Sequence, residues 1–460
     1  MFRILLAFVG LSLALPLFAG DPPKKKYQSI ERLALERLAA THADVEAIQK
    51  SRKPIDPLPD VTDFRCIMHA HAEDSTHTGG TLPEMLADAK KVDVNAILLT
   101  DHYRPPRDFI DGRWRGIKDG VLFIPGSETR GFLAYPVASV LKQMEASPKD
   151  FIAAVTADRG MIFLSHLEER KDHPVDGLTG MEIYNRHYDV IRDPASLLGL
   201  IAMLTDEKQL ADLHEARRLY HAEMLAFQCD YPSLYLKKWD EGQLKRRLTG
   251  VAANDCHHNM ILQVKMVDEN TVLIGTNVDE DKSMKKVTST LRPGIKAMTK
   301  GHKPGDILTK LDLDPYARSF LNSSTHILAK KLEEGSIRDA LHAGHAYVAH
   351  DWICDPKGFQ FLAESSNLER VGIMGDDVTL IKGLQLKANL TAPAYIRLMR
   401  AGVEVAKWDS AASIAFPVEK AGAYRLEAWM KLDGEYRPWI YSNPIYVRES
   451  KANPTGTASK

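Results

Sequence analysis

The segment FRCIMHAHAEDSTH, residues 64–77, places three histidines within nine residues at the end of a mostly apolar run. Side chains alternate along a strand, so His69 and His71 point to the same side and can hold one ion between them. His77 lies farther along the following loop and can fold back toward a second ion. Packing alone does not explain three imidazoles at a strand end, and we therefore expect a metal site here.

The sequence beyond this segment alternates short apolar runs with helical patterns. Buried parallel strands are expected at 96–100, 121–125, 161–165, 181–184 and 249–253, and helices at 81–91, 148–158 and 205–227. A helix followed by a short strand at 335–348 closes this region. Alternating strands and helices predict an α/β barrel or a doubly wound sheet.

Polar side chains at the ends of these strands favour the barrel. The candidates are His69, His71, His77, Asp101, His102, Glu128, His166, Asp255 and His257. The carboxyl ends of barrel strands converge on one face, whereas those of an open sheet spread along an edge. The candidate ligands are nitrogen or hard oxygen, with no thiolate, which suits Zn²⁺, Mn²⁺ or Fe²⁺.

The chain divides into five segments by composition and period. Residues 1–20 are a signal peptide, with Arg3 before an apolar run, and 21–60 are an N-terminal helix and a proline-containing linker. Residues 61–356 form the barrel. Residues 357–448 change to a period of two, typical of a small all-β sandwich, and 449–460 are expected to form a disordered tail.

The net charge and the predicted signal peptide limit the functional classes to which the chain can belong. The chain has 60 Lys and Arg against 61 Asp and Glu, so nothing in its charge points to nucleic acid. The signal peptide predicts a periplasmic or secreted protein without stable membrane insertion beyond that peptide; its cleavage is left open. The four cysteines are few and far apart for a disulfide framework, and Cys256 is expected to serve packing.

The order of these motifs resembles that of the polymerase and histidinol phosphatase (PHP) family of metal-dependent hydrolases. The resemblance covers about residues 61–355 and implies a distorted (β/α)7 TIM-like barrel with two or three metals. It also implies that His69, His71, Glu128 and Asp255 hold one ion and that His77, His102 and His257 hold a second, with Glu128 bridging. His166 would serve a third ion or the substrate.

One departure concerns the third ion. Family members with three metals usually carry a further histidine shortly after the glutamate, and residues 130–137 contain none. His187 is a substitute ligand, although a role at the surface or behind the ligands is favoured for it. We therefore expect two divalent ions, with a third left open; Zn²⁺ and Mn²⁺ are preferred, and Fe²⁺ is an alternative. The segment 438–446 also resembles the ending of the exported, carbaryl-hydrolase-like branch, which implies an immunoglobulin-like C-terminal module.

A metal-dependent phosphoesterase is the function that this pattern favours. Two ions flanking a bridging water lower its pKa from about 15.7 toward about 7, which makes hydroxide the nucleophile at neutral pH. Asp101, His257 and His166 are the expected catalytic residues, and Arg104, Arg130 and Arg186 could bind the anion of a small phosphoester substrate. One alternative is a carboxylester or carbamate hydrolase using the same site. The other is an exported binding protein whose metal is structural.

Overall fold

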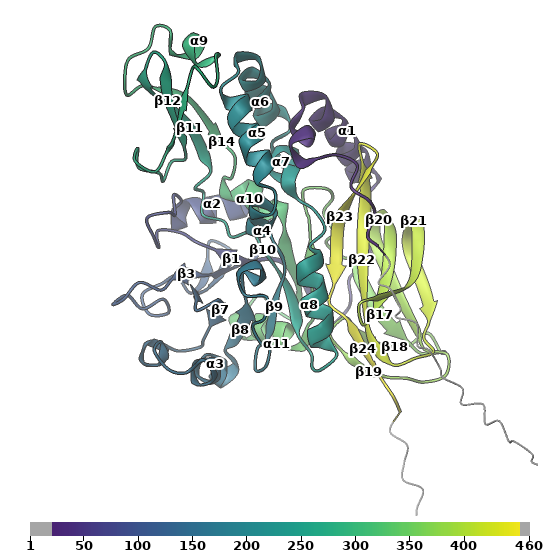
Figure 1. Cartoon of the computed structure of the whole chain (residues 1–460). Helices are drawn as coiled ribbons and strands as arrows, with labels where there is room; N and C mark the ends of the chain where they lie inside the picture. Colours follow the sequence, from purple (N-terminus) through teal and green to yellow (C-terminus); the bar gives the residue numbers. More distant parts are fainter. Residues whose placement is uncertain (1–20, 451–460) are drawn as a thin grey trace, which may run out of the picture.

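The computed structural model of the protein describes residues 21–450 (Figure 1). The predicted signal peptide and most of the predicted tail lie outside these residues. In the described part, no helix combines the length and the apolar character that a membrane crossing requires. The four cysteines lie within it, and all are buried and unpaired, Cys256 among the packing residues as expected.

Parallel strands position the quoted segment. Strand β1 (Thr62–Ala70) has its last six residues buried and pairs in parallel with β2 (Ala96–Leu99), which pairs in parallel with β5 (Val121–Ile124). On the other side of the site, β8 (Met161–Leu164), β9 (Gly180–Asn185) and β10 (Thr249–Ala253) are parallel to one another. Strands β2, β5, β8, β9 and β10 correspond to the five apolar runs that were predicted as strands, and the structure confirms each of them.

The mixed α/β class is confirmed, whereas a closed barrel is not found. The described strands belong to three separate sheets, and only an isolated bridge between Ala70 and Cys256 joins the end of β1 to the segment after β10. Strand β7 (Phe132–Tyr135) also interrupts the parallel order. It follows β6 (Ser127–Thr129) after a two-residue turn, which forces an antiparallel hairpin, and it pairs antiparallel with β8 as well.

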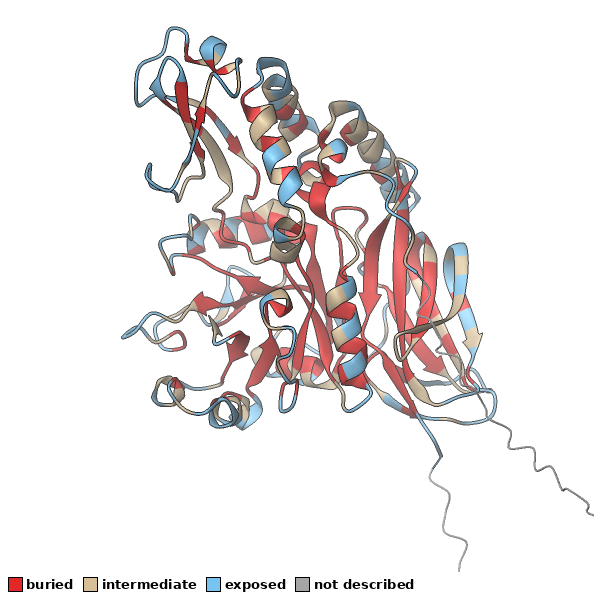
Figure 2. Ribbon diagram, in the orientation of Figure 1, coloured by how far each residue is buried: buried red, intermediate tan, exposed pale blue. Residues whose placement is uncertain are grey.

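The C-terminal strands continue the sheet that contains β1. Strand β23 (Glu435–Ser442) pairs with β16 (Ala346–Ala349), and β16 pairs with β15 (Ser324–Ala329), the neighbour of β1. The strands beyond β23 are antiparallel, apart from one parallel pair, β19 with β24. They are β17 (Gln360–Glu364), β18 (Arg370–Ile373), β19 (Asp377–Thr379), β20 (Gln385–Arg400), β21 (Val403–Pro417), β22 (Gly422–Leu432) and β24 (Ile445–Arg448). The division into a barrel and a sandwich thus runs across one hydrogen-bonded sheet, buried along most of its length (Figure 2).

Helices cover this framework and correct one prediction. The predicted helix at 205–227 is wrong in its extent, because a break at Tyr220 separates α6 (Glu207–Leu219) from α7 (His221–Leu225). A further helix, α5 (Pro194–Leu204), precedes them and was not predicted. The remaining α-helices are α1 (Leu35–Ser51), α2 (Leu82–Lys91), α3 (Pro148–Thr156), α4 (Arg186–Ile191), α8 (Ser233–Gln243), α9 (Ile295–Thr299), α10 (Tyr316–Asn322) and α11 (Glu334–Ala343). Short strands β3 (Asp101–His102) and β4 (Gly116–Lys118) complete the main body.

A four-stranded antiparallel sheet was not predicted and projects from the main body (Figure 1). It consists of β11 (Ile261–Asp268), β12 (Thr271–Gly275), β13 (Lys285–Thr288) and β14 (Ile307–Asp312). Strands β11 and β14 pair with each other, with Ile261 opposite Asp312, so the sheet leaves and rejoins the main body at one place. We call this sheet the insertion sheet.

A buried ionic cluster beneath β1 predicts a pH dependence of stability. His326 of β15 is fully buried, and its ring lies 2.7 Å from Asp63 Oδ1 and 3.0 Å from Asp351 Oδ1. Burial lowers the pKa of His326, but these two carboxylates more than offset burial and raise it to about 9. The folded state therefore keeps this proton above the ordinary pKa of 6.5, so its contribution is full below pH 6.5 and is lost as the pH rises through about 9.

We expect His326→Gln to lower the free energy of unfolding most strongly at pH 6. The difference between the wild type and this variant should shrink up to pH 9.5, by at most about 1.4 kcal/mol per pH unit. Urea unfolding curves of both proteins at pH 6, 7.5 and 9.5 measure it. A difference that is the same at all three pH values would contradict the ionic assignment.

Candidate metal centre

The predicted ligands gather where parallel strands end. His69 belongs to β1 and His71 follows it, His102 ends β3, and Glu128 belongs to β6. Three more candidates, His166, Asp255 and His257, follow β8 and β10. These seven side chains form two groups whose ligand atoms lie within 4.8 Å of one another.

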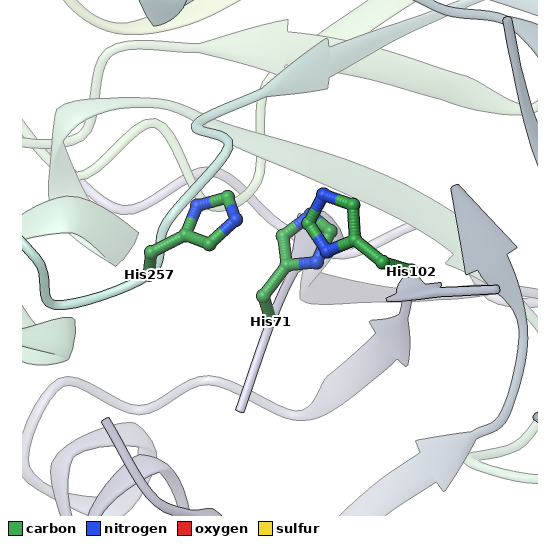
Figure 3. A group of neighbouring side chains, drawn as sticks. All are labelled: His71, His102 and His257. Atoms are coloured by element: carbon green, nitrogen blue, oxygen red, sulfur yellow. The ribbon is translucent and has the colours of Figure 1, made fainter. Parts of the chain in front are cut away.

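The first group consists of His71, His102 and His257, whose rings face one another (Figure 3). The rings of His71 and His257 are stacked with centroids 4.0 Å apart, and those of His71 and His102 are 4.3 Å apart. The second group consists of His69, Glu128, His166 and Asp255. The resemblance implies another division, in which His71 joins His69 and His166 stands apart.

Glu128 contacts both groups. Its Oε2 atom lies 3.5 Å from Nε2 of His69, 3.6 Å from Nε2 of His71 and 3.3 Å from Nε2 of His102. Its Oε1 atom lies 2.9 Å from Nε2 of His166. One carboxylate thus reaches imidazoles of both groups, which is the position that the predicted bridging role requires; that role stays a prediction.

The donor atoms fit a bound cation. Three of them have no hydrogen-bond partner among the described residues, although they are buried: Nε2 of His69, Nε2 of His257 and Oδ1 of Asp255. The Nε2 atom of His69 lies 3.3 Å from Oδ1 of Asp255. Two ligands bound to one tetrahedral ion at about 2.05 Å are separated by roughly 3.35 Å. Unpaired buried donors at this separation are what a divalent ion requires.

Carboxylates behind the histidines orient them, and the sequence analysis missed these residues. Asp74 Oδ2 lies 2.9 Å from Nδ1 of His71 and 2.7 Å from Nδ1 of His102. Glu182 Oε1 lies 2.8 Å from Nδ1 of His69. A carboxylate that accepts from Nδ1 fixes the tautomer and leaves Nε2 free for a metal. Asp74 stands within the quoted segment, whereas Glu182 lies 113 residues from His69 with no local signal.

The electrostatics of the centre favour positive charge. Burial lowers the pKa of His69, but Asp255 and Glu128 more than offset it and raise that pKa to about 10. The carboxylates of Glu128 and Glu168 likewise overcome burial at His166 and raise its pKa to about 12. Cation binding therefore competes with protons on these two rings. Burial, with the neighbouring His71, lowers the pKa of His257 to about 3 and leaves this ring neutral.

The backbone is also unusual at the ligands. His166 and Asp255 adopt left-handed conformations, with φ of 46° and 51°. Residues other than glycine occupy this region at a cost and concentrate at functional sites. With this conformation both side chains belong to the second group, and His166 Nε2 lies 3.6 Å from Oδ2 of Asp255 and 2.9 Å from Oε1 of Glu128.

A cavity of about 440 Å³ opens onto the centre. Arg186, one of the predicted anion-binding residues, lines it, as do His77, His187 and Glu169. The rings of His77 and His102 are 4.6 Å apart, but His77 belongs to neither ligand group. Its role as a ligand stays a prediction.

Three other predicted site residues lie away from this cavity. Asp101 is buried and forms ion pairs with Arg113 and Arg107, which occupy its carboxylate. Arg104 is exposed, and Arg130 packs over the ring of Phe151 and donates to the Met144 carbonyl. Their catalytic and substrate-binding roles remain untested predictions, and the geometry gives them no support.

His187 approaches His166 through a shared carboxylate. Glu168 Oε1 lies 3.1 Å from Nδ1 of His166 and 3.0 Å from Nδ1 of His187, and Tyr235 donates to its other oxygen. These three side chains, His166, Glu168 and His187, form a third group of possible ligands. Because His166 already faces Glu128 through Nε2, we interpret Glu168 as a residue that positions both rings.

Asp74 offers a test of the centre. We expect Asp74→Asn to weaken metal binding by about 10- to 100-fold, because the amide cannot accept from two imidazoles as the carboxylate does. Competition with a chromogenic chelator measures this affinity. Glu73→Gln is the matched control, since Glu73 is an exposed acidic neighbour in the same loop. Equal affinities in the two variants would show that Asp74 does not position His71 and His102.

Comparisons with known proteins add little to this geometry. No family model matches the chain, and no curated protein matches it. The chain is similar to a solved structure from Bacteroides vulgatus ATCC 8482, a two-domain protein containing a predicted PHP-like metal-dependent phosphoesterase. The identity is 14% and the TM-score 0.34, over 86% of this chain and 99% of that chain. The function is therefore argued from the site itself.

Proposed function

We propose that the chain is a metal-dependent hydrolase of the PHP kind that acts on phosphoesters. The observation that carries this proposal is the position of Glu128 between two groups of ligands at the base of an open cavity. The proposal includes the distorted barrel, the immunoglobulin-like module, and export to the periplasm or the medium. A carboxylester or carbamate hydrolase remains the alternative for the same centre.

The residues present would hold two ions. His71, His102 and His257 would bind one, His69, His166 and Asp255 the other, and Glu128 would contact both. When bound, divalent ions supply positive charge next to the reacting ester and lower the pKa of water. Zn²⁺ and Mn²⁺ suit this set of imidazole and carboxylate donors, as does Fe²⁺.

The cavity wall supports an anionic substrate. Arg186 presents a guanidinium group, whose planar fork suits phosphate oxygens. The lining has two apolar side chains, Val190 and Met260, and no aromatic ring other than histidine among the described residues. A neutral aromatic ester would find little apolar surface here, so the lining favours phosphoesters over carboxylic esters.

Two histidines that line the cavity are placed to accept or transfer a proton. The Nε2 atom of His257 makes no hydrogen bond with the described residues, and it can bind either an ion or a proton but not both. His77 lines the cavity, and its partial burial together with the charge of His102 lowers its pKa below the ordinary value, which favours the neutral ring. A neutral imidazole at the mouth can relay a proton between solvent and the leaving group.

A substrate panel tests this proposal. Bis-p-nitrophenyl phosphate, p-nitrophenyl phosphate and p-nitrophenyl acetate are assayed with Mn²⁺, with Zn²⁺ and after chelation. We expect metal-dependent turnover of a phosphoester that stops with the chelator. Turnover of the acetate alone would favour the carboxylester alternative. No turnover of any substrate by metal-loaded protein would favour a binding protein with a structural metal.

A further inference from the structure

A second cluster of possible ligands lies where the insertion sheet joins the main body. His258 stands between β10 and β11, Asp312 is the last residue of β14, and Asp314 follows two residues later. Their ligand atoms lie within 4.8 Å of one another. The cluster shares no residue with the two groups around Glu128 and has no part in the proposed function.

His258 carries the inference because its ring is buried with one nitrogen unpartnered. The residue is 9% exposed, and its Nε2 atom lies 3.3 Å from Oδ1 of Asp312. Neither of these two atoms has a hydrogen-bond partner among the described residues. Their separation equals that between His69 Nε2 and Asp255 Oδ1 and is close to the roughly 3.35 Å expected for two ligands on one tetrahedral ion.

The other ring nitrogen is held by a carboxylate, as in the main centre. Nδ1 of His258 lies 2.8 Å from Oε1 of Glu84. Glu84 is itself fixed, because it forms a capping box with Thr81 at the N-terminus of α2. This arrangement directs Nε2 toward the two aspartates, in the way that Asp74 directs Nε2 of His71 and His102.

Asp314 supplies the second carboxylate and, unlike the partly exposed Asp312, it is buried. It is 1% exposed, and burial raises its pKa, an effect that the charge of Arg186 offsets only in part. Its oxygens accept the backbone N–H groups of Met260 at 2.8 Å and Asn259 at 3.3 Å. Each carboxylate oxygen retains a further lone pair that can bind a cation.

We propose that Nε2 of His258 and the carboxylates of Asp312 and Asp314 bind a single divalent cation, separate from the centre at Glu128. One imidazole and two carboxylates suit Zn²⁺ or Mn²⁺. The ion would tie the segment before β11 to the end of β14, and so hold both strands at the root of the insertion sheet. It would also fix Asn259 and Met260, which line the cavity of the main centre.

Metal content tests this site without reference to activity. The full chain and its variants are loaded with Zn²⁺, dialysed against metal-free buffer and analysed by inductively coupled plasma mass spectrometry. We expect Asp312→Asn to hold one ion per chain fewer than the wild type. His302→Ala is the matched control, because His302 and Asp306 form an exposed pair 3.6 Å apart elsewhere in the insertion region, and it should keep the wild-type number.

Unchanged metal content in folded Asp312→Asn would overturn the proposal and leave a plain ion pair between a protonated His258 and its carboxylates. If Asp312→Asn does not fold, Glu84→Gln decides, because glutamine preserves the capping box while weakening the hold on His258. We expect one ion of this variant to bind about 10- to 100-fold more weakly in chelator competition. If Glu84→Gln binds every ion as tightly as the wild type does, the proposal is also overturned.

Discussion

Glu128→Gln is expected to lower kcat/KM for a phosphoester by about 10³-fold or more. Glu128 lies within 3.6 Å of imidazoles from both ligand groups, so its replacement would remove a negative ligand from both of the proposed ions at once. Neutral glutamine also cannot offset the charge of two cations placed close together. Losses of 10²–10³-fold follow the removal of one electrostatic contact at an active site, and this change affects more than one.

Two measurements accompany this prediction. Metal analysis should show fewer ions per chain in Glu128→Gln, while circular dichroism should remain that of the wild type. Glu169→Gln is the matched control, since Glu169 lines the same cavity but is about half exposed and belongs to neither ligand group. Wild-type turnover and metal content in Glu128→Gln would refute the bridging assignment and, with it, the proposed centre.

Deleting residues 357–460 is expected to abolish cooperative folding of the remaining chain. The deletion removes β23, whose Ser442, Tyr441 and Ile440 pair with β16. Trp439, Ile440 and Tyr441 are fully buried. Burying a large apolar side chain contributes about 1.5–3 kcal/mol, so three of them approach the 5–15 kcal/mol that stabilises a typical domain.

Polar contacts across the same junction add to this effect. Arg425 is buried and donates to both carboxylate oxygens of Asp240 in α8 at 2.7 Å. Asn443 exchanges hydrogen bonds with Gly250 of β10 and also donates to the carbonyl of Ala346. Removing these partners leaves buried polar groups of the main body unsatisfied, at about 1–3 kcal/mol each.

Thermal unfolding followed by circular dichroism measures the result. The truncated chain should show no cooperative transition, whereas Asn443→Ala should fold with a lowered Tm. Asn389→Ala should change Tm less, because Asn389 is a half-buried residue of β20 whose side chain, among the described residues, forms hydrogen bonds only with Gln360 and Ser413 of the neighbouring strands. A truncated chain that unfolds cooperatively near the wild-type Tm would show that residues 357–448 form an independent domain.

The residues of the main centre were predictable because two local rules govern them. Strand alternation places His69 and His71 on one side, and the convergence of parallel strand ends predicts that His102, Glu128 and His166 lie near them. Neither rule assigns each histidine to one ion. That assignment depends on ring orientation, which Asp74 and Glu182 determine through contacts made only in the folded chain.

The fold was predictable to the same extent. Buried parallel strands are apolar runs, so β2, β5, β8, β9 and β10 were recognisable, whereas β11, β13 and β14 of the insertion sheet mix charged or exposed residues with apolar ones and lack such runs. The pairing of β7 with β8 and that of β16 with β23 depend on which edges meet in space.

The sequence by itself therefore determined the α/β class, the strand ends that carry ligands and the chemistry of those ligands. The tertiary structure decided which imidazoles lie close to Glu128, that Asp101 forms ion pairs with arginines, and that His258 lies against Asp312. The physical reason is separation along the chain. Side-chain type and strand period depend on neighbouring residues, whereas ligand grouping and ion pairing arise between distant side chains that only folding brings within a few ångströms.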